Sequence, residues 1–182
     1  MDITVKRIGR ELKYQGRIVD FYADIMELPD GRTTVWDYIE HRKCAAAVVP
    51  VLPDGRLLLV RQYRNAVERT TLEIPAGARD SLEEPYEVCA ARELEEETGY
   101  RCEKLEFLIS THSAVAYCNE RVDIFVARDL VPASRHLDPD EFVDVEAYTL
   151  EELCAQIYEG KLQDAKTVAA IMAYKNKYQP VS

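Results

Sequence analysis

The pattern of apolar residues predicts a strand-rich first third of the chain. Arg17–Leu28 is rich in Ile, Val, Phe and Tyr, ends at a Pro-Asp-Gly turn and is followed by a returning strand over Thr33–Glu40. Ala45–Leu52 is a continuous apolar run, which is typical of a strand covered on both faces. A second Pro-Asp-Gly turn leads to a strand over Arg56–Tyr63, so we expect two hairpins in series.

A helix is predicted over Pro85–Thr98. Proline suits an opening helical position, and Gly99 suits the left-handed residue just past a helix end. On a helical wheel, five residues share one arc that we expect to be the buried face: Val88, Ala90, Ala91, Leu94 and Thr98. The remaining face is rich in glutamate, which makes the predicted helix amphipathic.

The last third of the chain mixes strands and helices. We expect strands over Lys104–Ser110, Arg121–Arg128 and Val143–Tyr148. Thr149 followed by Glu152 is a capping box that predicts a helix through Tyr158, and Asp164 is expected to cap a final helix. Strands and helices alternate without a regular period, so the predicted class is mixed α/β.

Composition excludes several kinds of protein. The 182 residues carry 23 Lys and Arg against 33 Asp and Glu, a net charge of −10, which disfavours nucleic-acid binding. The longest apolar run is too short to cross a membrane, and the first residues lack the apolar core of a signal peptide, so we expect a cytoplasmic protein. The five cysteines form no Cys-x-x-Cys pair and are expected to be reduced and mostly buried.

Three glutamates form an unusual cluster on the first predicted helix. Glu93, Glu96 and Glu97 lie within an arc of about 100°, where like charges repel one another. They also occupy the last turn, where the helix dipole disfavours negative charge, and Arg92 is the only neighbouring cation on that side. One interpretation is an ordinary solvated face. The other is a site for Mg²⁺ or Mn²⁺, cations that prefer oxygen ligands.

This segment resembles the Nudix box. From Arg92 to Gly99 the chain reads Arg-Glu-Leu-Glu-Glu-Glu-Thr-Gly, which matches the second half of the box position by position, and Tyr100 takes the final apolar place. The first half starts at Gly77 and contains one extra residue before the helix, so either Glu83 or Glu84 takes the place of the first glutamate of the box.

The flanking sequence is similar to the ADP-ribose pyrophosphatase branch of the Nudix hydrolases. The similar stretches are Leu59–Arg64, Leu72–Gly77, Asp140–Phe142 and Gly160–Thr167. The resemblance implies an α/β/α sandwich with a mixed sheet over residues 43–182, preceded by a small antiparallel β region over residues 1–42. It also implies a homodimer in which the N-terminal strands are exchanged between protomers.

The resemblance further implies which residues form the site. Metal ligands would be the backbone carbonyl of Ala76 and the side chains of Glu93, Glu96, Glu97 and Glu141, with Arg92 bracing the glutamates. Catalytic roles would fall to Glu96, Glu97 and Glu141, and substrate contacts to Trp36, Arg64, Glu73 and Glu120. In this scheme Trp36 stacks on adenine, although an interface or core tryptophan is the alternative, and Arg64 contacts the diphosphate unless it is an ordinary surface charge.

The function implied is Mg²⁺-dependent hydrolysis of a nucleoside diphosphate sugar, with ADP-ribose giving AMP and ribose 5-phosphate. Glu141 or a neighbouring aspartate would act as the general base, since Pro139 occupies the position of the usual glutamate. The alternatives are a pyrophosphatase for another nucleotide sugar or a dinucleotide, and a Nudix-fold sensor that binds such a metabolite without hydrolysing it. A sensor would be expected to have lost the acidic cluster, which this chain retains.

Overall fold

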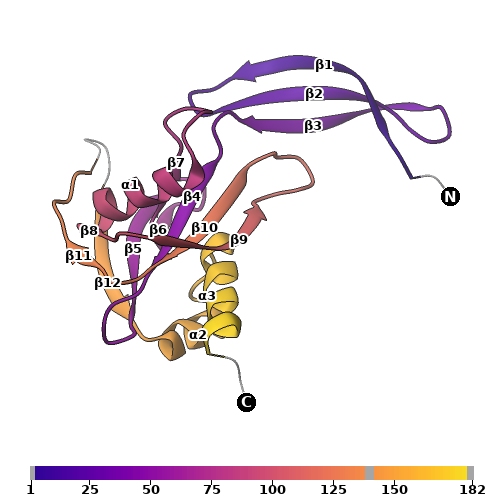
Figure 1. Cartoon of the computed structure of the whole chain (residues 1–182). Helices are drawn as coiled ribbons and strands as arrows, with labels where there is room; N and C mark the ends of the chain where they lie inside the picture. Colours follow the sequence, from indigo (N-terminus) through magenta and orange to yellow (C-terminus); the bar gives the residue numbers. More distant parts are fainter. Residues whose placement is uncertain (1–2, 138–141, 180–182) are drawn as a thin grey trace. The chain divides into compact units, whose positions relative to one another are not determined.

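The computed structural model describes residues 3–137 and 142–179 and divides the chain into two compact units (Figure 1). The first unit contains the chain up to Cys44 together with His112–Arg121, and the second contains Ala45–Thr111 and the residues from Val122 onward. The expected site residue Glu141 lies outside the described residues. The expected division at residue 42 stays a prediction.

The first unit is built on a three-stranded antiparallel sheet in the order β1-β2-β3. Its strands are β1 (Lys6–Gln15), β2 (Val19–Glu27) and β3 (Thr33–His41), so the first predicted hairpin is confirmed. The turn between β2 and β3 places Gly31 at φ 83°, a left-handed conformation that glycine adopts without steric cost. The segment His112–Arg121 joins this sheet through a bridge between Ile39 and Cys118.

The second unit is an α/β/α sandwich built on a mixed sheet and a second, smaller sheet. The mixed sheet has the order β7-β4-β10-β9, in which β4 runs parallel to β10 and antiparallel to β7. The second sheet has the antiparallel order β12-β5-β6. The strands are β4 (Ala45–Pro50), β5 (Leu57–Arg64), β6 (Arg69–Glu73), β7 (Ala76–Ala78), β8 (Tyr100–Arg101), β9 (Leu105–His112), β10 (Arg121–Ala127), β11 (Val131–Pro132) and β12 (Val143–Tyr148).

Alternate residues of β4 face two different hydrophobic clusters, which explains the layers. Ala46 and Val48 pack with residues of helix α1 (Tyr86–Thr98) on one side of the sheet. Ala47 and Val49 pack with residues of α2 (Leu150–Tyr158) and α3 (Ala165–Tyr178) on the other side (Figure 1). Because both faces are covered, β4 is apolar throughout, and the prediction of a strand buried on both faces is confirmed.

The caps confirm the predicted end of α1 and the predicted starts of α2 and α3, whereas Pro85 is the extended N-cap of α1 rather than its first helical residue. Gly99 ends α1 in the left-handed conformation with φ 72°, and Thr149 and Glu152 form both hydrogen bonds of a capping box on α2. Asp164 caps α3 by accepting from the N–H of Thr167. None of the helices within the described residues is long and apolar enough to cross a membrane.

The second predicted hairpin is wrong. Strands β4 and β5 flank the expected turn but belong to different sheets, and a single bridge between Val51 and Leu57 joins the ends of the two runs. One edge of β4 is paired with β10 along the whole strand, and the first half of the other edge is paired with β7, so β5 meets β4 only past the end of the strand. All five cysteines are free as expected, but only Cys89 and Cys154 are buried and the other three are half-buried.

Candidate active site

Helix α1 turns part of its acidic face toward the protein interior. Its buried residues are Cys89, Ala90, Glu93, Leu94, Glu97 and Thr98, and Glu97 is only 2% exposed. The prediction that Val88 and Ala91 lie on the buried face is wrong, because both are exposed. The buried arc is rotated toward the glutamates because α1 packs against β4 and β7, where the carboxylates find polar partners.

Arg92 connects the carboxylates of α1 to one another. Its Nη1 donates to Glu93 Oε1 at 2.6 Å and to Glu96 Oε2 at 2.9 Å, and its Nε donates to Glu84 Oε1 at 3.4 Å. Its Nη2 also donates to the backbone carbonyl of Ala78 in β7 at 2.9 Å. The planar guanidinium therefore spaces the glutamates and ties the helix to β7, as a fixed fork of donors can.

Glu84 is the glutamate of the pre-helix loop that belongs to this cluster. Besides accepting from Arg92, its side chain accepts from the backbone N–H of Asp80 at 2.6 Å and is largely buried. Glu83 is exposed, and its own N–H donates to Ser81 Oγ. Of the two glutamates that the sequence leaves open, Glu84 is thus the one that the loop directs toward α1.

The backbone of strand β7 lies in close contact with the buried glutamates of α1. The N–H of Ala76 donates to Glu97 Oε2 at 3.1 Å. A Cβ atom on Gly77 would lie 2.1 Å from Glu93 Oε1, so only glycine leaves room for that carboxylate.

Burial raises the pKa of the nearby Cys89 thiol to about 12, and the Glu93 charge adds to that effect, so this cysteine is not a nucleophile at neutral pH.

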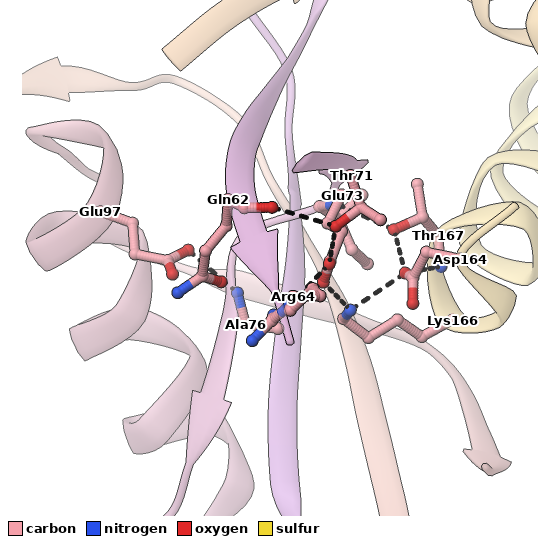
Figure 2. Close-up of polar contacts among 10 residues, drawn as sticks. Gln62, Arg64, Thr71, Glu73, Ala76, Glu97, Asp164, Lys166 and Thr167 are labelled. Atoms are coloured by element: carbon pink, nitrogen blue, oxygen red, sulfur yellow. Dashed lines mark hydrogen bonds and ion pairs between the residues drawn. The ribbon is translucent and has the colours of Figure 1, made fainter. Parts of the chain in front are cut away.

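A second polar network lies beside the acidic helix (Figure 2). Arg64 donates through Nε and Nη2 to the two carboxylate oxygens of Glu73, each at 2.8 Å. Lys166, on α3, donates to the same carboxylate, and Thr71 Oγ1 donates to it at 2.6 Å. Two expected site residues, Arg64 and Glu73, are therefore paired with each other.

Sequence reasoning missed two members of this network, Thr71 and Lys166. The sequence signal for Lys166 is that it falls in the stretch before the last helix that resembles the pyrophosphatase branch. Asp164 caps α3 and accepts from Lys166 Nζ at 3.0 Å, while Thr167 Oγ1 accepts from the N–H of Ile74 at 2.9 Å. These bonds anchor the start of α3 to the chain that follows β6.

The two networks influence each other electrostatically. The hydrogen bonds to Glu73 are the main cause that raises the pKa of Arg64, and the charge of Glu97 contributes in the same direction. Glu73 is 3% exposed, and burial opposes its ionisation, yet Arg64 and Lys166 lower its pKa to about 2. Glu73 is therefore a fixed negative charge, and Arg64 lies within electrostatic reach of the acidic helix.

Two further expected site residues, Trp36 and Glu120, lie in the first unit. Trp36 stands on β3 opposite Asp24 of β2 and is 48% exposed. Glu120 Oε1 lies 3.7 Å from His41 Nε2, and the Nδ1 atom of His41 accepts from the N–H of Cys44 at 2.9 Å. That acceptor role leaves the ring proton of a neutral His41 on Nε2, which faces the Glu120 carboxylate.

The glutamate carboxylates of α1 are oxygen ligands of the kind that a hard divalent cation prefers. Gly77 of β7 leaves room for the Glu93 carboxylate, whereas the backbone oxygens of Gly77 and Ala78 already accept hydrogen bonds from Cys89 and Arg92. The described residues do not place three His, Cys, Asp or Glu side chains around one point as a complete coordination shell. Arg92 instead holds Glu93 and Glu96 by hydrogen bonds.

Known proteins resemble the chain over most of its length. A family profile described as the NUDIX domain matches residues 41–171. A Bacillus subtilis (strain 168) protein named ADP-ribose pyrophosphatase is 39% identical over 168 residues, which cover 91% of this chain and 90% of the relative. The methanol dehydrogenase activator of Bacillus methanolicus is also 39% identical with the same coverage. A crystal structure of an ADP compounds hydrolase matches with a TM-score of 0.87 over 100% of both chains at 24% identity, which supports the fold alone.

Proposed function

Because this chain belongs to the Nudix family, we propose that it hydrolyses the diphosphate bond of ADP-ribose, giving AMP and ribose 5-phosphate. The observation that carries the proposal is the burial of Glu93 and Glu97 against β7, with Arg64 within electrostatic reach. Buried carboxylates beside a half-exposed guanidinium suit a site that handles a metal-bound diphosphate. A nucleoside diphosphate sugar is the substrate class.

Glu93, Glu96, Glu97 and the carbonyl of Ala76 would hold Mg²⁺ or Mn²⁺, together with Glu141 from outside the described residues. When bound, a divalent cation neutralises diphosphate charge and lowers the pKa of a coordinated water. Arg92 contributes by fixing the spacing of the carboxylates, since its guanidinium touches both Glu93 and Glu96. Bringing ligands together in advance reduces the cost of ordering them on binding.

In the reaction a water oxygen forms a bond to one phosphorus atom of the diphosphate, and the bond from that phosphorus to the bridging oxygen breaks. The leaving phosphate keeps the electron pair, and the water proton passes to a base. Glu96 orients the water, and Glu141 or a neighbouring aspartate accepts the proton. Arg64 binds the diphosphate oxygens through its forked N–H donors.

The first unit supplies the base-binding surface and the contact between protomers in this proposal. Trp36 presents a large exposed ring suited to stacking on adenine.

On the opposite face of the same sheet, Ile25 and Val35 form an exposed cross-strand apolar pair, and Tyr14 is exposed as well. A homodimer with exchanged N-terminal strands would cover such a face. Light scattering should give twice the monomer mass, and Val35→Arg should lower it to the monomer mass.

The activity is tested by measuring phosphate-containing products from a panel of ADP-ribose, nucleotide hexoses and dinucleotides, with Mg²⁺, Mn²⁺ or EDTA. We expect metal-dependent AMP release from ADP-ribose with the highest kcat/KM. Glu97→Gln should lose activity by at least about a hundredfold, whereas Glu95→Gln, on the other side of the same helix, should retain it. Another best substrate would reassign the specificity, and no turnover of any compound would favour a non-hydrolysing sensor.

A further inference from the structure

Two cations share one buried carboxylate at the edge of the proposed site. Glu73 is 3% exposed and accepts hydrogen bonds from both Arg64 and Lys166. Figure 2 shows that Arg64 approaches from the side of Glu97, whereas Lys166 approaches from helix α3. Because Lys166 also pairs with Asp164 at 3.0 Å, the two cations offset two carboxylates, and Glu73 is the carboxylate that both of them contact.

The two cations differ in their freedom to move. The Arg64 side chain is 40% exposed, and that of Lys166 is 16% exposed. Lys166 is also held by Asp164, the residue that caps α3, at 3.0 Å. Arg64 stands at the end of β5 and is held through its guanidinium by Glu73. Arg64 is therefore the cation with the more open path to solvent, and Lys166 is the one held by a second carboxylate.

Moving Arg64 onto a diphosphate would be unfavourable if Glu73 had no other partner. A buried carboxylate that loses its counterion carries the full penalty of an uncompensated charge. Lys166 and Thr71 both donate to Glu73, so two hydrogen bonds and a cation that is shared with Asp164 remain when Arg64 turns away. The contacts of Glu73 therefore allow Arg64 to leave while the carboxylate keeps other partners.

We propose that Lys166 is a positioning residue that neutralises Glu73 whenever Arg64 leaves it to bind the diphosphate of the substrate. The inference rests on the proposed function, because it assigns Arg64 to the diphosphate. Without Lys166, Arg64 stays on Glu73 and is less available to the substrate. Lys166 itself does not touch the substrate and acts through Glu73.

The test measures kcat and KM for ADP-ribose with Mg²⁺, together with the dissociation constant of ADP-ribose in EDTA. Lys166→Met should raise KM and the dissociation constant about tenfold, with kcat nearly unchanged. This is the loss expected when the charge-assisted contact between Arg64 and the diphosphate is weakened. Arg64→Met should have at least the same effect. The double variant should be no worse than Arg64→Met alone, because Lys166 acts through Arg64.

Two further variants separate positioning from a merely structural role. Lys166→Arg keeps a cation that can hydrogen-bond to Glu73 and should retain affinity within about twofold. Glu73→Gln added to Lys166→Met removes the charge that holds Arg64 and should restore much of the lost affinity; it also leaves no unpaired carboxylate if Lys166→Met alone folds poorly. The control is Lys161→Met, which removes an exposed lysine paired with Glu159 and should change nothing.

Several results would overturn the inference while leaving the proposed function intact. These are an unchanged KM in Lys166→Met, effects of Lys166→Met and Arg64→Met that multiply in the double variant, or a failure of Glu73→Gln to restore affinity. An unchanged KM in Arg64→Met would remove the premise and overturn the inference directly. Wild-type protein without any turnover would instead overturn the proposed function and the inference together.

Discussion

Glu73 should make the stability of this protein depend on pH in a way that one substitution removes. Arg64 and Lys166 outweigh the effect of burial and lower the pKa of Glu73 from 4.5 to about 2. A carboxyl with a lowered folded-state pKa stabilises the protein above its unfolded pKa and loses that contribution as pH falls through the folded value. The contribution should be complete above about pH 5 and lost progressively toward about pH 2.

The expected magnitude follows from the size of this change in pKa. At about 1.4 kcal/mol for each tenfold change in proton affinity, lowering the pKa from 4.5 to about 2 corresponds to roughly 3 kcal/mol. The side chain is 3% exposed, so solvent screening does not reduce this value much. Loss of a charge from a buried ion pair elsewhere costs about 3–5 kcal/mol, which agrees with this range.

The assay is urea unfolding of the wild type and of Glu73→Gln, whose neutral amide mimics the protonated acid, at a series of pH values from 3 to 7. The difference in unfolding free energy should be roughly 3 kcal/mol near neutral pH and should shrink steadily below about pH 5. Glu159→Gln, which removes one partner of an exposed ion pair, should change stability by less than about 1 kcal/mol. A difference for Glu73→Gln that stays constant with pH would refute the reasoning.

Three other substitutions test the acidic helix, the cation that braces it, and the cap of α2. Gly77→Ala places a Cβ 2.1 Å from Glu93 Oε1 and should sharply lower metal-dependent turnover while the thermal midpoint changes little. Arg92→Leu removes the cation between Glu93 and Glu96 and should lower both the thermal midpoint and the apparent affinity for Mg²⁺, measured by activity titration. Thr149→Ala removes the capping box of α2 and should cost about 1 kcal/mol of unfolding free energy without altering kcat, and a large loss of kcat would contradict this assignment.

The order of local elements could be predicted from the sequence because its signals act over a few residues. Gly99 ends α1 as predicted, since a left-handed residue after a helix is a property of the local backbone. The capping box at Thr149 and the cap at Asp164 were likewise predictable from side chains three residues apart. The acidic cluster was visible as a repeated glutamate pattern on one helix, and its likeness to the Nudix box indicated the family.

Where elements pair was not predictable from such signals. The Pro-Asp-Gly turn after Ala45–Leu52 is typical of a hairpin, yet β4 pairs with β10, whose residues come more than seventy positions later. The choice depends on which edges and faces are already occupied in the folded chain. For the same reason Val88 and Ala91 are exposed while Glu93 is buried, because β7 offers the carboxylates polar partners that the wheel of an isolated helix cannot show.

The sequence by itself determined the family, the helix ends and the acidic helix, because these follow from local spacing of side chains. Only the tertiary structure decided that Arg64 and Glu73 form an ion pair. The sequence resemblance implies two separate substrate contacts instead. Glu73 and Lys166 are 93 positions apart, and their ion pair exists only because α3 docks beside β6. The charge of a buried group depends on what folding places around it, and no local pattern encodes that environment.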